Sequence, residues 1–173
     1  MAEFVPGQTA LVVHVPEAEA VVSAWRRRFD SSAALGVPAH VTVLYPFLDA
    51  DRVDAEVVAA LGEVFAAHDA FEARFSTCGR FPDVIYLAPD PDGPFRELTE
   101  AVAARWPEAP PYGGRFEDVM PHLTVAEGVA PDVQDMIEAD LAGRLPVITR
   151  VRAVALETYD GALWKETASF PLG

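Results

Sequence analysis

The sequence has little of what disulfide-bonded, membrane-spanning or long-nucleic-acid-binding proteins need. Its 173 residues include a single cysteine, Cys78, so no internal disulfide can form and a reducing cytoplasm is the expected location. The apolar stretch at residues 10–15 is too short to cross a bilayer or to serve as a signal-peptide core. We therefore expect a cytoplasmic protein without a membrane partner.

Basic residues are also scarce. Lysines and arginines together number 13, against 27 acidic residues, which gives a formal net charge of −14. Long nucleic acid is usually held by dense Lys/Arg surfaces, which this chain cannot supply. The acidic field is screened over about 8 Å, so it does not exclude a small phosphorylated ligand in a locally basic cleft. The composition favours a nucleotide-sized ligand over long nucleic acid.

What the chain does have is enough apolar sequence to build a core, because 51% of its residues are hydrophobic. Apolar residues three or four apart predict amphipathic helices over residues 17–29, 51–68, 95–106 and 133–143, and apolar stretches outside them predict strands. Strands are expected at residues 9–15, 40–46, 71–77, 84–88, 122–126, 147–158 and 162–170.

The expected elements follow a repeated order. Residues 9–68 run strand, helix, His-x-Thr strand, helix, and residues 84–143 repeat that order. A closing hairpin is predicted around the Tyr-Asp-Gly turn at residues 159–161. We expect one domain, residues 1–173, with an α+β fold of two pseudo-symmetric lobes around a central groove. Because the lobes would complete each other, we expect a monomer.

Two matching motifs, HVTV at residues 40–43 and HLTV at residues 122–125, carry the chemistry. Side chains alternate along a strand, so His40 and Thr42 share one face, as do His122 and Thr124. Facing each other, the motifs would offer two imidazoles for proton transfer and two hydroxyls for phosphoryl oxygens. A single His-x-Thr is better explained as a structural strand, but the matched pair favours a phosphoester site.

The motif regions resemble a known family. Residues 38–47 (PAHVTVLYPF) and 120–126 (MPHLTVA) look like the twin signatures of the 2H phosphoesterase superfamily, in its 2′-5′ RNA ligase-like or cyclic phosphodiesterase branch. The resemblance implies lobes of antiparallel sheet plus helices and hydrolysis of 2′,3′-cyclic or related phosphates of small nucleotides or RNA ends. No metal or other cofactor is implied. His40 and His122 would be the acid/base pair, with Thr42 and Thr124 as phosphate binders.

Five other residues are candidates for substrate binding. Tyr45 and Phe47 follow the first motif, and Phe81 and Tyr86 flank the strand that opens the second half. These aromatic side chains could stack on a base, although aromatic residues in such positions more often pack in a core. Arg115, in the glycine-rich loop before the second motif, could clamp a phosphate or be a solvated arginine.

Other interpretations stay open. A metal hydrolase is one, although the sequence lacks a two-histidine helix with a carboxylate. A non-catalytic nucleotide-binding module and a 2′-5′ RNA ligase are two more. A serine or cysteine nucleophile is disfavoured because there is no Gly-x-Ser-x-Gly motif. His14, on the first strand, is expected to be structural, and the basic run at residues 26–28 to be a solvated helix face.

Overall fold

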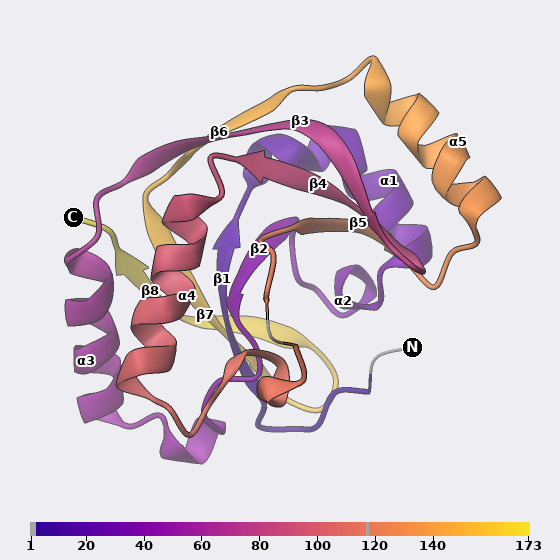
Figure 1. Ribbon diagram of the computed structural model, residues 1–173. Coiled ribbons are helices and arrows are strands. Elements are labelled where there is room, and N and C mark those ends of the chain that lie inside the picture. Colours follow the sequence, from indigo (N-terminus) through magenta and orange to yellow (C-terminus); the bar gives the residue numbers. More distant parts are fainter. Residues whose placement is uncertain (1–2, 117) are drawn as a thin grey trace.

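The protein folds into two four-stranded antiparallel sheets with helices packed around them (Figure 1). The computed structural model describes residues 3–116 and 118–173. The first sheet has the order β2-β1-β7-β8, and the second has the order β5-β4-β3-β6. The first sheet contains β1 (Thr9–His14), β2 (His40–Leu44), β7 (Ala153–Tyr159) and β8 (Trp164–Pro171). The second contains β3 (Phe71–Phe81), β4 (Val84–Asp90), β5 (Leu123–Glu127) and β6 (Val147–Val151). The helices are α1 (Glu19–Phe29), α2 (Ser31–Ala34), α3 (Ala55–Ala66), α4 (Gly93–Arg105) and α5 (Pro131–Ala142), and short 3-10 turns occur at Pro16–Ala18, Ala50–Arg52 and Pro111–Gly114.

The repeated order predicted from the sequence is confirmed. The first half runs β1-α1-β2-α3, and the second runs β4-α4-β5-α5. Both motif strands, β2 and β5, are edge strands of their sheets, and they contact each other. The two motifs, whose histidines are 82 positions apart in the chain, are therefore brought together.

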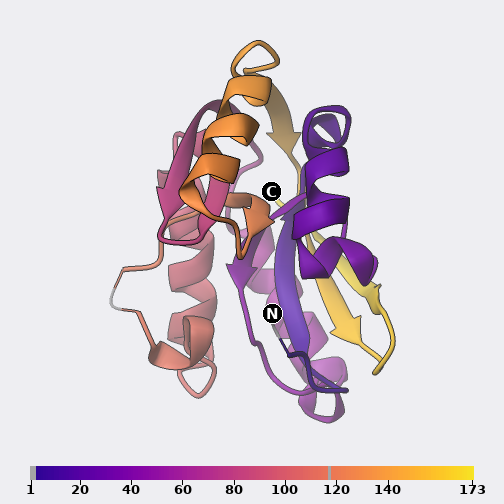
Figure 2. The ribbon, with the colours of Figure 1, turned by 90° about the vertical axis from the view of Figure 1, so that its right-hand side faces the viewer.

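Two helices connect the halves, because each packs against the motif strand of the other half. Helix α1, from the first half, packs against β5, and α4, from the second half, packs against β2. The Thr99 hydroxyl on α4 donates to the Val43 carbonyl of β2 over 2.7 Å. Figure 2 shows β1, β8 and α1 on one side of the molecule and β3, α4 and α5 on the other. This exchange holds the two motif strands in a fixed relation.

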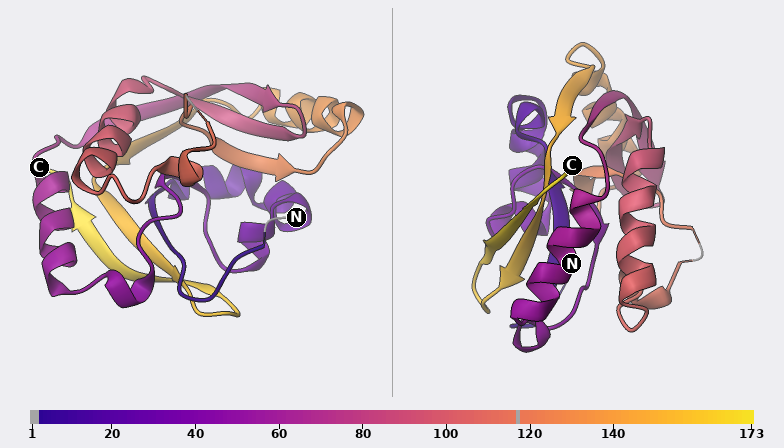
Figure 3. Two further views of the ribbon diagram at one scale, coloured as in Figure 1. Left: turned by 60° about the horizontal axis from the view of Figure 1, so that its bottom comes forward. Right: turned by 90° about the vertical axis from the view of Figure 1, so that its left-hand side faces the viewer.

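Local sequence explains the helix boundaries and faces. Asp54 caps α3 by accepting from the Val57 amide at 2.9 Å. One turn apart on the same helix, Leu61 and Phe65 are fully buried. Helices α3 and α4 stand side by side in the right panel of Figure 3. No helix in the described ranges is long and apolar enough to cross a membrane.

One predicted element is wrong. Residues 147–158 were expected to form a single strand, but the structure has two, β6 and β7, separated at Arg152. Strand β6 pairs with β3 in the second sheet, while β7 pairs with β1 and β8 in the first. Apolar residues are buried in both strands, so the hydrophobic pattern does not show where the chain passes from one sheet to the other. The left panel of Figure 3 shows the two sheets that this segment joins.

Candidate active site

The structure brings all four motif side chains to one pocket. His40, Thr42, His122 and Thr124 line a cavity of about 210 Å³ between the two halves. The residues between and after them, Val41, Val43, Leu123 and Val125, are all buried in the core. This is the alternation expected of strands, with polar groups on the pocket side and apolar groups beneath. His122 itself lies immediately before the first residue of β5.

Both histidines are held in the same way. His40 Nδ1 lies 2.8 Å from the Pro38 carbonyl oxygen, and His122 Nδ1 lies 2.7 Å from the Met120 carbonyl oxygen. A carbonyl can only accept, so each Nδ1 carries the proton that it donates, and Nε2 of the neutral ring is free to accept one. The residue two positions before each histidine thus sets its tautomer and the direction of its ring.

The surroundings keep both imidazoles neutral. Burial, which is the largest cause, and the nearby Arg26 guanidinium together lower the pKa of His40 from 6.5 to about 4. Burial also lowers the pKa of His122. In the unliganded protein at neutral pH, both rings are therefore ready to accept a proton. A bound phosphate, being an anion, would favour the protonated form that an acid catalyst needs.

Two of the predicted aromatic residues support His122. The rings of Phe81 and Tyr86 pack edge-on against its imidazole, with centroids 5.2 Å and 5.5 Å away. Tyr86 reaches this position because Gly79, opposite it on β3, has no side chain. A Cβ on Gly79 would collide with the Tyr86 ring. Neither aromatic residue belongs to the pocket lining, and both contact the His122 ring.

The remaining predicted residues separate into three cases. Tyr45 lines the pocket, and its hydroxyl donates to Gln8 at 3.0 Å. Phe47, a candidate for stacking on a base, is a core residue, because it is 4% exposed and its ring packs on Trp106. Arg115 is exposed and is not one of the residues that line the pocket.

The sequence analysis missed three pocket aromatics, Phe4, Tyr112 and Trp164. Phe4 and Trp164 pack on Tyr45 from opposite ends of the chain, which no local pattern could have shown. Tyr112 adopts a left-handed backbone, φ 50°, and its amide donates to the Tyr45 carbonyl over 2.6 Å. The pKa of the Tyr112 phenol is raised by burial, and the neighbouring Thr42 hydroxyl offsets part of that rise. In the sequence, the two glycines that follow Tyr112 were the feature that could have indicated this tight turn.

His14, expected to be structural, lies on β1 beside the pocket. It pairs with His40 in the β1–β2 register, and its Nε2 lies 2.8 Å from Glu157, a buried residue of the pocket lining. The hydrogen bond to Glu157 raises the pKa of His14. His14, Glu157 and Glu166 form a group that could ligate a cation. Neither His40 nor His122 takes part in it.

Comparison with known proteins places the chain in a family. Residues 14–163 match the model of the 2′-5′ RNA ligase superfamily. A Bacillus pumilus (strain SAFR-032) protein named "Putative phosphoesterase" is 30% identical over 115 residues, which cover 65% of this chain and 64% of that relative. Escherichia coli LigT complexed with 3′-AMP has a TM-score of 0.64 at 16% identity, covering 97% of this chain and 99% of its own. The protein TT0787 of Thermus thermophilus also has a TM-score of 0.64, at 23% identity, covering 95% of this chain and 97% of its own. The chain belongs to the 2′-5′ RNA ligase superfamily, and so to the 2H phosphoesterases that its twin motifs resemble.

Proposed function

We propose that the protein is a phosphoesterase that opens 2′,3′-cyclic phosphates of small nucleotides or RNA ends, with His40 and His122 as its acid/base pair. The observation that carries the proposal is the matched geometry of the two histidines. Both line one pocket, His40 on the edge strand β2 and His122 immediately before the edge strand β5. Both are oriented by an Nδ1 hydrogen bond to a carbonyl two residues earlier.

The reaction follows from two nitrogens with opposite tasks. One neutral Nε2 takes a proton from water as the water oxygen bonds to phosphorus. The other histidine, protonated once the anionic substrate is bound, gives its proton to the 3′ oxygen as the phosphorus–oxygen bond breaks. The product is a 2′-phosphomonoester. Thr42 and Thr124 donate hydrogen bonds to the non-bridging oxygens as charge builds on them.

Small-nucleotide substrates agree with the size and charge of the protein. A pocket of about 210 Å³ suits part of a nucleotide, and a net charge of −14 disfavours long nucleic acid. Solved structures of E. coli LigT include complexes with 3′-AMP and with ATP, both small nucleotides. We further propose a metal-independent reaction in a monomeric, single-domain, cytoplasmic protein. Activity on 2′-5′ RNA linkages is the alternative that the family name supports.

The test is turnover of adenosine 2′,3′-cyclic monophosphate, followed by ³¹P NMR, with and without extensive prior chelation. We expect conversion to the 2′-monophosphate at the same rate in both samples. Loss of activity after chelation, restored by a divalent cation, would refute the metal-free mechanism. Tight binding without turnover would instead identify a nucleotide-binding module. Turnover restricted to 2′-5′-linked dinucleotides would support the alternative.

A further inference from the structure

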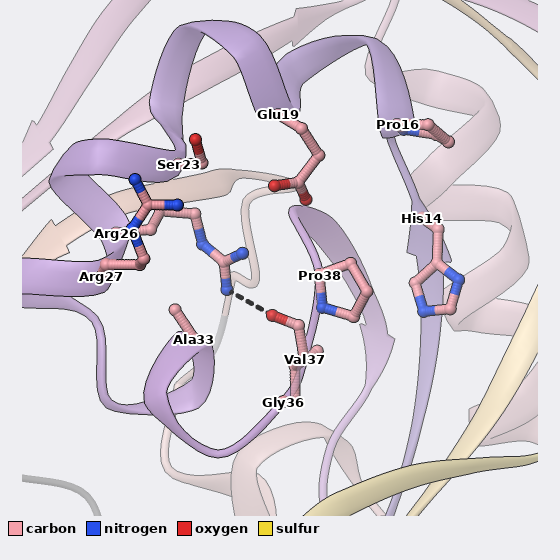
Figure 4. Close-up of a pocket in the computed structure, with 10 residues that line it drawn as sticks. All are labelled: His14, Pro16, Glu19, Ser23, Arg26, Arg27, Ala33, Gly36, Val37 and Pro38. Carbon is pink, nitrogen blue, oxygen red and sulfur yellow. Dashed lines mark hydrogen bonds between the residues drawn. The ribbon is translucent and has the colours of Figure 1, made fainter.

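A second and larger pocket lies beside the active one. It encloses about 490 Å³ and is formed by α1, the loop before β2 and the end of β1 at His14 (Figure 4). The described charged residues of its lining are Glu19, Arg26, Arg27 and, when protonated, His14. The mechanism proposed above assigns no role to this pocket. Two of the 13 basic residues of the chain line this one cavity, and one of them, Arg26, forms an ion pair with the buried Asp30.

Arg26 is built into the wall of this pocket rather than solvated, which corrects the expectation for the basic run at residues 26–28. It is 2% exposed, and its Nε donates to Asp30 at 2.9 Å. Its Nη2 donates to the Val37 carbonyl at 3.0 Å and to the Ser32 hydroxyl at 3.2 Å. These bonds fix the plane of the guanidinium. Among the described residues, Nη1 has no hydrogen-bond partner.

Arg27 and Ser23 complete a donor face on α1. Residues 23, 26 and 27 are three and four positions apart, so they lie on the same side of the helix. Figure 4 shows both arginine side chains on that side, with the Ser23 hydroxyl one turn away. Glu19 is the opposing charge of the lining, and one of its oxygens is occupied by the Ala39 amide. Two guanidiniums and a hydroxyl are suited to a phosphate group.

This pocket adjoins the proposed active site. Val37 lines both cavities. Pro38 lines the second pocket, and its carbonyl is the group that accepts from His40 Nδ1. A substrate with its reacting phosphorus between His40 and His122 therefore has this pocket next to it, on the His40 side.

We propose that the second pocket is an anion subsite in which Arg26 and Arg27 bind a phosphate group of the substrate other than the one that reacts. This inference rests on the proposed function and specifies its substrate class. The substrate carries a second phosphate next to the terminal nucleoside, as at the end of a short RNA with a 2′,3′-cyclic phosphate. The buried Arg26 and the exposed Arg27 both donate hydrogen bonds to that phosphate.

The test compares three substrates that share one reacting group. They are adenosine 2′,3′-cyclic phosphate, the same nucleotide with a 5′-phosphate, and the dinucleotide ApA with a terminal 2′,3′-cyclic phosphate. We expect kcat/KM about tenfold higher for the dinucleotide than for the first substrate, since charge-assisted hydrogen bonds are the strong ones. A matching gain for the 5′-phosphorylated mononucleotide assigns the effect to the phosphate. A gain confined to the dinucleotide would assign it to the second nucleoside and would overturn the inference.

The variant to use is Arg27→Gln, because Arg26 supports the fold. We expect Arg27→Gln to remove most of the gain while the simplest substrate stays within twofold of the parent. Arg28→Gln is the matched control, since it removes the same charge from a neighbouring position whose guanidinium lies over the Phe29 ring. The inference is overturned if the parent shows no gain, if Arg28→Gln loses as much as Arg27→Gln, or if Arg27→Gln slows all three substrates equally.

A binding measurement separates failure of this inference from failure of the proposed function. If the parent turns over none of the substrates, the proposed function is wrong, and titration with inorganic phosphate still tests the subsite. We expect two sets of shifted amide resonances in NMR spectra, one near His40 and His122 and one at residues 23–38. The second set should disappear in Arg27→Gln. A single set at the histidines would refute the subsite.

Discussion

Binding of inorganic phosphate should restore an ordinary pKa to His40. In the free protein burial lowers this pKa from 6.5 to about 4, a penalty on the protonated ring of about 3 kcal/mol at 1.36 kcal/mol per unit. One phosphate charge about 4 Å from the ring contributes about 4 kcal/mol in the opposite direction at an effective dielectric constant of 20. The two effects nearly cancel, so we expect His40 to titrate between about 6 and 7 in the complex.

The assay is an NMR titration of the histidine Cε1–Hε1 signals between pH 3.5 and 8, with and without phosphate. The chain has four histidines, and His40→Gln identifies the signal of interest. An unfolded His40 takes up a proton near pH 6.5, whereas the folded one does so only near pH 4. Its contribution to stability is therefore complete above pH 6.5 and is lost as pH falls toward 4, so spectra must be checked for folded protein there. A free His40 that titrates near 6.5, or a phosphate-induced rise below one unit, would refute the electrostatic reasoning.

Three further substitutions test neighbouring parts of the site. Tyr112→Phe should lower kcat about tenfold with little change in KM, because the lost hydroxyl lies beside Thr42, the proposed phosphate binder. Tyr159→Phe is the control, since its hydroxyl donates to a loop carbonyl, and equal losses in both variants would contradict this role. Gly79→Ala should displace the Tyr86 ring and so reduce turnover at least tenfold. It should also lower the free energy of unfolding, measured in urea, by about 1–3 kcal/mol. An unchanged rate of turnover would show that the Tyr86 ring does not orient His122. Arg26→Met should lower the free energy of unfolding by about 3 kcal/mol, because it leaves a buried carboxylate unpaired, and a loss below 1 kcal/mol would contradict that.

The sequence was sufficient to predict the half of the site that depends on local geometry. Alternation along a strand required His40 and Thr42 to share a face, and the repeated order of elements placed the second motif in an equivalent setting. Both expectations are met in the pocket. The orientation of each imidazole also has a local cause, a carbonyl only two residues away.

The rest depends on contacts between distant segments. Phe4 and Trp164 meet at the pocket because β1, β7 and β8 are neighbours in one sheet. The break at Arg152 is decided by pairing with β3 on one side and β1 on the other, which the local pattern does not encode. Phe47 illustrates the same limit, since only the packing of Trp106 against it distinguishes a core ring from one available to a base.

The most direct test of the central claim is a double-mutant comparison of kcat/KM for a 2′,3′-cyclic nucleotide. If His40 and His122 serve one transition state, His40→Ala and His122→Ala should each lower the rate by about 10²–10⁴-fold. The double variant should then be little worse than either single one, because groups acting as a unit are not additive. An unaltered rate in either single variant, with the fold preserved, would contradict the two-histidine mechanism.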